Sequence, residues 1–304
     1  MRSQVPLVYV QILNWNGLND TLACLDSVKK SSYPSFQVVV VENGSRNGEH
    51  EASVIKKHHP WVTVIKNTRN LGFAGGHNTG FRHSMSKGAD YVLLLNNDAI
   101  VAPDLLGRLV SFMQDHPRAG ATGAKVYYWH PQDVIWSAGS RLFFGKSWLR
   151  GRGDKDVGQY DAPWNAHQVV GAVMLLSARA LRTVGLFDDA YFAYYEETKW
   201  CCQARQKGFE IWYVPSAKAW HKIAASSGGG TSPLSLYYLV RNRFFLIGDV
   251  LPLWQRPFAY LFWVAEVAVR TILYGVKRKR RLLDSLGRGV VDACFGRRGP
   301  RLFA

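Results

Sequence analysis

An apolar run that ends in three polar residues, within residues 90–101, constrains the fold of this 304-residue chain most strongly. Residues 91–95 are aromatic, β-branched or aliphatic without alternation, which favours a central strand covered on both faces. Asn96, Asn97 and Asp98 follow at its carboxyl end, where open α/β sheets place their ligands. An acidic group there can bind a divalent cation through oxygen, and the cation can bind a diphosphate. An ordinary Asn-Asn-Asp turn is the alternative, and it is the more common one for such residues in isolation.

Strand and helix patterns alternate along the first half of the chain. Residues 7–13, 36–41 and 62–66 are apolar runs typical of buried strands, and helical segments at 18–30 and 49–58 separate them. Polar residues follow each strand. This alternation predicts an α/β fold with a mostly parallel central sheet and helices on both faces.

Glycine and polar residues mark the boundaries of the predicted catalytic core. The glycine-rich segment 70–80 predicts a loop that lets the backbone approach a ligand closely, and 129–168 predicts irregular structure with short hairpins. Residues 225–233 have linker composition, so a mobile loop is expected there. We therefore divide the chain into a catalytic domain, 1–232, and a helical C-terminal extension, 233–304, in which residues 234–276 are expected to be helical.

The positive charge lies mainly in the extension. The chain carries +16 overall, and residues 233–304 hold 13 Lys/Arg against 4 Asp/Glu. Residues 258–276 are nearly all apolar, interrupted by Glu266 and Arg270, which can pair at i and i+4. A basic run, 277–281, follows at once. This pattern favours an interfacial helix on an anionic leaflet, although the helix could instead cover the core.

The cysteines and the N-terminus indicate the compartment. Cys24, Cys201, Cys202 and Cys294 show no CxxC spacing, which favours neither a zinc site nor a disulfide framework. The first residues lack the apolar stretch of a signal peptide. We expect a cytoplasmic protein, peripheral on the inner face of the cell membrane.

Several short motifs in a fixed order resemble those of the family 2 glycosyltransferases, especially the rhamnosyltransferase-like members with the A-type nucleotide-sugar fold. The resemblance covers about residues 7–245. The motifs are Asn-Trp-Asn-Gly at 14–17, Val-Glu-Asn-Gly-Ser at 41–45, the glycine-rich 70–80, Leu-Asn-Asn-Asp at 95–98, Gly-Leu-Phe-Asp at 185–188, Tyr-Tyr-Glu-Glu at 194–197 and Trp-His-Lys at 220–222.

The resemblance implies a nucleotide-diphospho-sugar donor, a Mg²⁺ or Mn²⁺ cofactor and direct displacement with inversion. In such proteins an Asp-x-Asp motif and often a later His hold the metal, which makes Asp98 and His221 the implied ligands. Asn96 replaces the first Asp and removes one anionic ligand. A lone polar residue at a strand end is the alternative for His221.

The resemblance also implies the catalytic and donor-binding residues. It makes Glu197 the base that accepts the acceptor's proton, with Glu196 in support, although acidic pairs at helix starts are also ordinary charge placement. The implied donor-binding residues are Asn14, Asn16, Glu42, Asn43, Asn70, Gly72, Phe73, Gly75, Gly76, Asn78, Asn96, Asn97 and Arg241.

The sequence hypothesis is an inverting glycosyltransferase, with rhamnose the first guess, acting on a cell-surface glycan or a lipid-linked acceptor. The alternative is a noncatalytic nucleotide-sugar or glycan-binding partner with the same fold, which Asn96 and Lys199 motivate. We expect no nucleic-acid partner, because the basic residues cluster beside an apolar helix rather than among stacking aromatics.

Overall fold

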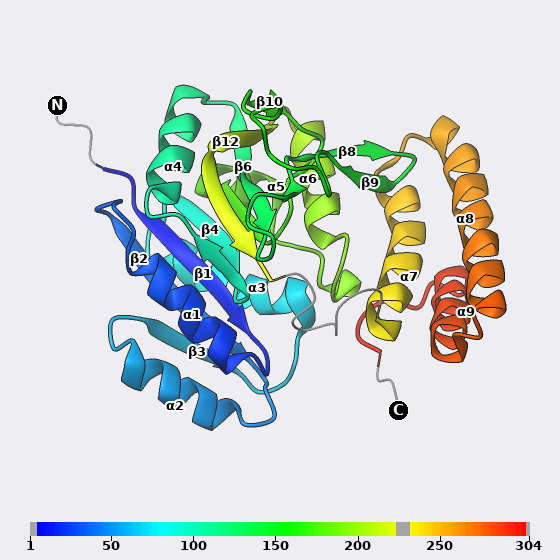
Figure 1. Cartoon of the computed structure of the whole chain (residues 1–304), viewed down its shortest axis with the longest axis horizontal. Coiled ribbons are helices and arrows are strands. Elements are labelled where there is room, and N and C mark those ends of the chain that lie inside the picture. Colours follow the sequence, from blue (N-terminus) through cyan, green and yellow to red (C-terminus); the bar gives the residue numbers. More distant parts are fainter. Residues whose placement is uncertain (1–4, 223–231, 302–304) are drawn as a thin grey trace.

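A mixed sheet with helices on both faces and a further helical layer at its C-terminal side make up the protein (Figure 1). The computed structural model describes residues 5–222 and 232–301. The strands are β1 Val8–Asn14, β2 Phe36–Asn43, β3 Thr63–Asn67, β4 Tyr91–Asn96, β5 Ala99–Val101, β6 Ala119–Tyr128, β7 Ile135–Ser137, β8 Ser140–Phe143, β9 Lys146–Leu149, β10 Trp164–Asn165, β11 Val173–Ser177 and β12 Glu210–His221. The helices are α1 Leu18–Val28, α2 Gly48–His58, α3 Gly72–Ser86, α4 Leu105–Asp115, α5 Ala178–Val184, α6 Glu196–Gln206, α7 Pro233–Val250, α8 Arg256–Val276 and α9 Arg280–Cys294, with 3₁₀ turns η1 Asp189–Tyr191 and η2 Leu253–Gln255.

The strand order of the main sheet is β10-β12-β6-β11-β4-β1-β2-β3. Strands β4, β1, β2 and β3 pair in parallel, as do β6 and β12. Strand β11 is antiparallel to both of its neighbours, β4 and β6. The predicted α/β class with a largely parallel sheet is therefore confirmed, with one reversed strand inside it.

Alternating side chains of the central strands bury two separate cores. On β1, Val8, Val10 and Ile12 pack with residues of α1, α2 and α4, whereas Tyr9 packs with residues of α3, α5 and α6. Successive strand side chains point to opposite faces, so an unbroken apolar run needs cover on both. The helices on both faces supply that cover.

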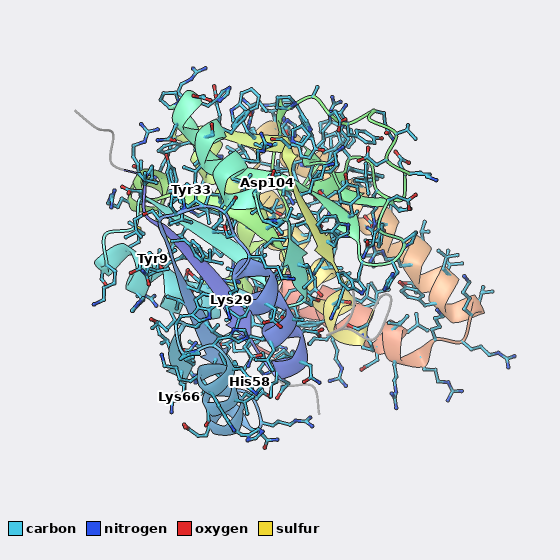
Figure 2. The ribbon with its side chains drawn as sticks, turned by 60° about the vertical axis from the view of Figure 1, so that its left-hand side comes forward. Tyr9, Lys29, Tyr33, His58, Lys66 and Asp104 are labelled. Carbon is cyan, nitrogen blue, oxygen red and sulfur yellow. The ribbon has the colours of Figure 1, made fainter. Side chains whose placement is uncertain are left out.

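The outer edge of the sheet is closed by charge. Lys66 on the edge strand β3 pairs with Glu49 of α2 at 2.7 Å, and Figure 2 shows Lys66 at this end of the molecule. A lysine on an edge strand disfavours pairing with another chain. The sheet can thus end at β3 without a partner.

Two predicted boundaries are wrong. The glycine-rich segment 70–80 is not mainly a loop, because α3 begins at Gly72 and includes its other glycines. Glycine is tolerated in this helix where it lies close to other groups: a Cβ on Gly76 would lie 2.5 Å from Leu13 Cδ1. The apolar run at 169–177 predicts a strand over that whole range, but β11 begins only at Val173.

The C-terminal helices form their own apolar cluster. Leu236 and Val240 of α7, Trp263 of α8, and Leu286 and Ala293 of α9 share it. The sequence predicted the α7 and α8 region as helical but did not predict α9. The rest of the predicted loop 225–233 lies outside the described residues, apart from Ser232, which caps α7, and Pro233, which begins it.

A carboxylate on α7 connects this helical layer to the sheet domain. Asp249 accepts hydrogen bonds from Lys199 of α6 at 2.8 Å, from Tyr191 at 2.9 Å and from Arg298 at 2.8 Å. Burial alone would raise the pKa of Asp249, but hydrogen bonds from Arg298, Lys199 and Tyr191 hold it well below its usual range. The ionised carboxylate is therefore part of the folded state.

We predict that Asp249→Asn lowers the free energy of unfolding by about 2–4 kcal/mol, because three donors lose a charged acceptor. The folded pKa is depressed, so this stabilisation is present above about pH 4 and is lost as pH falls below it. Urea unfolding at several pH values measures both effects. The matched control is Asp284→Asn. Because Asp284 pairs with Arg288 on the exposed surface, this substitution should lower the free energy of unfolding by at most about 1 kcal/mol. Equal losses for the two variants would contradict the prediction.

Candidate active site

The parallel strands end at one edge of the sheet and bring their polar residues together. Asn14 at the end of β1 is in register with Glu42 of β2, and Leu13 is in register with Asn96 of β4. On the other side, Asn43 is in register with Asn67 of β3. The strand-end motifs that are far apart in sequence therefore share this edge.

Asp98 and His221 face each other at this edge. His221 Nε2 lies 2.9 Å from Asp98 Oδ1, and each residue is only 7% exposed. The contact arises because β5 pairs antiparallel with the end of β12, with His221 opposite Ala99. Asn96 Nδ2 lies 3.3 Å from His221 Nε2, and the Trp136 ring packs 4.7 Å from the imidazole.

These two side chains offer one carboxylate and one imidazole to a cation. The buried Nδ1 of His221 has no hydrogen-bond partner among the residues that the structure describes. Among residues 5–222 and 232–301 no group of three or more His, Cys, Asp or Glu side chains is placed to hold a metal. Two protein ligands with the rest supplied by water and phosphate suit Mg²⁺ and Mn²⁺, which prefer oxygen and keep several waters. The donor set therefore fits such an ion.

Asn97 connects the 96–98 motif to the segment after β1 through hydrogen bonds. Its Nδ2 donates to Thr21 Oγ1 at 3.1 Å and to Gly17 O at 3.3 Å. On the other side, Lys222 Nζ donates to Asp20 Oδ1 at 2.7 Å. The loops after β1, β4 and β12 are thereby held together.

The residues predicted to meet the nucleoside have partners within the protein. Asn14 donates to Glu51 at 2.6 Å, and Asn16 Oδ1 accepts from the Arg46 backbone N–H at 2.9 Å. The Glu42 carboxylate accepts from the backbone N–H of Ser45 at 2.7 Å. In this conformation their side chains shape the loops that border the predicted nucleoside position.

The asparagines around the start of α3 act in a similar way. Asn43 Nδ2 donates to Gly72 O at 3.0 Å and to Asn70 Oδ1 at 3.1 Å. Asn78 donates to Phe187 O at 2.8 Å and accepts from the Phe187 N–H at 3.0 Å. Asn78 thus anchors the Gly-Leu-Phe-Asp segment.

Glu196 and Glu197 begin α6 as a coupled acidic pair. Burial raises the pKa of both carboxyls, and for Glu196 the neighbouring charge of Glu197 raises it further. A hydrogen bond from Glu196 and the backbone N–H groups of Glu197 and Thr198 limit the rise in the pKa of Glu197. These contributions favour protonation of Glu196 before Glu197 when the pair shares one proton. The Oε2 atom of each carboxyl has no hydrogen-bond partner.

One backbone segment, residues 171–172, connects the region of the Asp98–His221 pair with that of the Glu196–Glu197 pair. The Asn96 N–H donates to Ala172 O at 2.9 Å. A Cβ on the preceding Gly171 would lie 3.6 Å from Glu197 Cγ and 3.2 Å from the Phe73 ring. The predicted residues Phe73 and Glu197 therefore meet beside residues 171–172, and Asn96 lies on the other side of that segment.

Asn242 supports the loop that leads into the acidic pair, and sequence reasoning missed it. Its Nδ2 donates to the carbonyls of Tyr191, Ala193 and Tyr194 at 2.7–2.9 Å. Tyr194 and Tyr195 have φ of 68° and 75°, a region that residues other than glycine rarely adopt. A buried Asn between two arginines in an aromatic helix was the available signal.

Arg241, predicted to contact the donor, is instead 1% exposed. Its guanidinium donates to Gly299 O at 2.7 Å and to Tyr191 O at 3.2 Å, and it stacks over Tyr238. These contacts connect α7 to the C-terminal segment. The sequence pattern showed a cation near tyrosines but not the direction in which it points.

Sequence comparison identifies the family. The family described as "Glycosyltransferase like family 2" matches residues 6–244. The chain belongs to this family and is a glycosyltransferase, so the predicted resemblance is confirmed.

Two curated relatives are similar over most of their length. One is "dTDP-rhamnosyl transferase RfbF" of Shigella flexneri, 25% identical, with 79% of each chain covered. Another is "N-acetylglucosaminyl-diphospho-decaprenol L-rhamnosyltransferase" of Mycobacterium tuberculosis, 25% identical over 84% of this chain and 90% of the relative. The rhamnosyltransferase-like character predicted from the motifs is thus confirmed at the level of relatedness.

Solved structures confirm the fold. The mannosyltransferase PcManGT from Pyrobaculum calidifontis, solved with GDP-Man and Mn²⁺, superposes with a TM-score of 0.62 at 16% identity and covers 97% of this chain and 88% of that one. At this identity the likeness concerns the fold alone. The roles of individual site residues stay predictions.

Proposed function

We propose that the protein is a metal-assisted, inverting glycosyltransferase that moves a sugar, with rhamnose the first candidate, from a nucleoside diphosphate to a hydroxyl of a lipid-linked or cell-surface glycan. The observation that carries the proposal is the Asp98–His221 pair at the sheet edge, connected through residues 171–172 to Glu197. The names of the two rhamnosyltransferase relatives support the choice of sugar and of a lipid-linked acceptor.

Asp98 and His221 would hold the divalent cation, with Asn96 beside them. A bound Mg²⁺ or Mn²⁺ neutralises the charge that develops on a departing nucleoside diphosphate. The chain supplies one carboxylate rather than two, because Asn96 stands where the family motif carries an Asp. Donor phosphates and water must therefore complete the coordination.

Glu197 would accept the proton of the acceptor hydroxyl. The hydroxyl oxygen forms a bond to the anomeric carbon as the bond from that carbon to the diphosphate oxygen breaks, and the proton passes to Glu197 Oε2. A single displacement of this kind inverts the anomeric centre. The base role needs an ionised Glu197, and it is supported by the pKa of Glu196, which burial and the charge of Glu197 raise, so that Glu196 is the member of the pair that protonates more readily.

Helix α8 would attach the enzyme to an anionic bilayer from the cytoplasmic side. Its apolar side chains point outward: Leu261 is 68% exposed, Ile272 is 66% and Val276 is 79%. Its charged residues Glu266 and Arg270 pair with each other on the inner side at 2.6 Å. The segment Leu253–Val276 also has the length and hydropathy of a membrane-crossing helix. The basic run 277–281 at its end favours the surface orientation.

We predict that Glu197→Gln lowers kcat by at least about 100-fold while nucleotide-sugar binding persists, since only the proton acceptor is lost. Glu196→Gln is the matched control: the amide keeps a neutral donor beside Glu197, so kcat stays within about tenfold of the wild type. Because the pKa of Glu197 is raised, the wild-type rate falls with decreasing pH at values above the usual pKa range of glutamate. Transfer assays with a panel of nucleotide sugars measure all three. Donor binding without turnover in the wild type would instead favour the noncatalytic binding partner.

We predict that Asp98→Asn weakens Mn²⁺ binding in the presence of nucleoside diphosphate by at least about tenfold, because the remaining carboxylate ligand becomes a neutral amide. His221→Gln has a smaller effect in the same direction. Calorimetry or Mn²⁺ electron paramagnetic resonance provides the readout. Unchanged Mn²⁺ affinity in both variants would rule out this site.

We predict that the protein floats with vesicles containing phosphatidylglycerol and not with pure phosphatidylcholine vesicles. Replacing Lys277, Arg278 and Lys279 by Gln reduces the bound fraction strongly, since each basic residue near an anionic surface contributes about 1 kcal/mol. Arg288→Gln, on α9, is the control. Flotation that is insensitive to both lipid charge and the 277–279 substitutions would contradict a surface attachment.

A further inference from the structure

A cationic pocket lies between α7, α8 and the β8–β9 hairpin, apart from the Asp98–His221 pair. Its volume is about 200 Å³, which is room for several water-sized groups. The charged side chains that line it are Lys146, Arg152, Arg243, Arg270 and Glu266. Four cations against one carboxylate leave an excess of three positive charges.

The single carboxylate is already saturated by its neighbours. Glu266 Oε1 accepts from Lys146 at 3.1 Å and from Arg270 at 2.6 Å, and Oε2 pairs with Arg243. A purely structural ion pair needs one cation for this carboxylate. The other cations line the same concave space, where their mutual repulsion is unfavourable unless an anion joins them.

Arg243 adds an independent sign of a ligand. Its side chain is 4% exposed, it lines the pocket, and its Nε–H has no hydrogen-bond partner in the described part of the chain. A buried guanidinium donor without an acceptor is unfavourable, and phosphate oxygens match the geometry of such donors. The Phe262 ring, 4.9 Å from the guanidinium carbon, covers its other side.

The pocket adjoins the acidic pair on one side and the proposed membrane helix on the other. Tyr195 lines it and is two residues from Glu197 in the chain. Burial raises the pKa of Tyr195 to about 12, with Arg243 lowering it and Glu266 and Glu197 raising it, so both carboxylates act electrostatically on this phenol. Trp263 and Val267 of α8 line the opposite side.

We propose that this pocket binds the phosphate or diphosphate group of an amphipathic acceptor, and so holds the acceptor with its hydroxyl toward Glu197 and its lipid toward α8. The inference rests on the proposed transferase function and adds a site for the acceptor's anion. A phospholipid headgroup has the same chemistry as the acceptor's phosphate, so the experiment has to separate the two sources.

The direct test is binding of inorganic pyrophosphate to the full chain in EDTA, measured by calorimetry and thermal shift. We expect the pyrophosphate affinity of the Lys146→Gln/Arg270→Gln double variant, in which Arg243 still pairs with Glu266, to be at least about tenfold lower than that of the wild type. Glu266→Gln removes the competing internal anion, so affinity should rise and pyrophosphate should raise the melting temperature more than in the wild type. A structural role alone predicts the opposite for Glu266→Gln, since loss of the carboxylate would only destabilise the fold.

Two controls separate this pocket from other anion sites. Arg288→Gln removes one charge outside the pocket, and Asp98→Asn alters the donor site; neither should change pyrophosphate affinity in EDTA. Pyrophosphate binding that is equal in the wild type and the double variant would overturn the proposal. Nucleotide-sugar binding that persists in that case would leave the proposed function standing.

The source of the phosphate is tested with vesicles and acceptor. If the acceptor's diphosphate is the ligand, the double variant floats with phosphatidylglycerol vesicles as the wild type does, but its KM for a sugar-diphospho-lipid acceptor rises about tenfold with the donor KM unchanged. Loss of flotation with an unchanged acceptor KM would assign the pocket to phospholipid headgroups and overturn the proposal.

Discussion

The pairing of β5 with the end of β12 is the constraint on which the candidate site depends. Residue 98 and residue 221 are separated by most of the catalytic chain, and the short antiparallel ladder from Ala99 to Val101 brings them within 2.9 Å. Strand β12 reaches this position because it runs parallel to β6 near one end of the sheet. The position of a buried carboxylate beside an imidazole is therefore set by backbone hydrogen bonds rather than by flexible loops.

The second acidic centre depends on α7. Asn242 donates to three carbonyls of the 191–194 loop, which holds Tyr194 and Tyr195 at positive φ and presents Glu196 and Glu197 at the start of α6. Such strained backbone persists only where surrounding contacts determine it. The helix that follows the predicted catalytic domain thus takes part in shaping the site, and the same helix faces the cationic pocket through Arg243.

Helix α8 exposes apolar side chains on its outer side, although Trp263 is buried in the apolar cluster of the C-terminal helices. Glu266 and Arg270 face inward to a cluster of charges, whereas Leu261, Ile272 and Val276 face outward. A helix of a water-soluble surface normally buries its apolar stripe and exposes its charges. The outward apolar side chains and the inward charges are understandable if the outer face of α8 meets lipid and the inner charges meet an anion. Both proposals follow from this orientation of the helix.

The sequence by itself determined the strand-end motifs and the α/β class, because the apolar period and the polar residues at strand ends are local properties of the chain. The candidate roles of Asp98, His221 and Glu197 came from the resemblance of these motifs to the family. It could not determine that the Arg241 side chain turns into the core, or that the amides of Asn14 and Asn43 donate to neighbouring segments of the chain. Nor could it determine that Lys146 and Arg243, about a hundred residues apart, pair with the same carboxylate, Glu266. Those outcomes depend on which elements pack together. Side-chain direction and charge balance in a pocket arise only when distant segments meet, so the tertiary structure alone decided them.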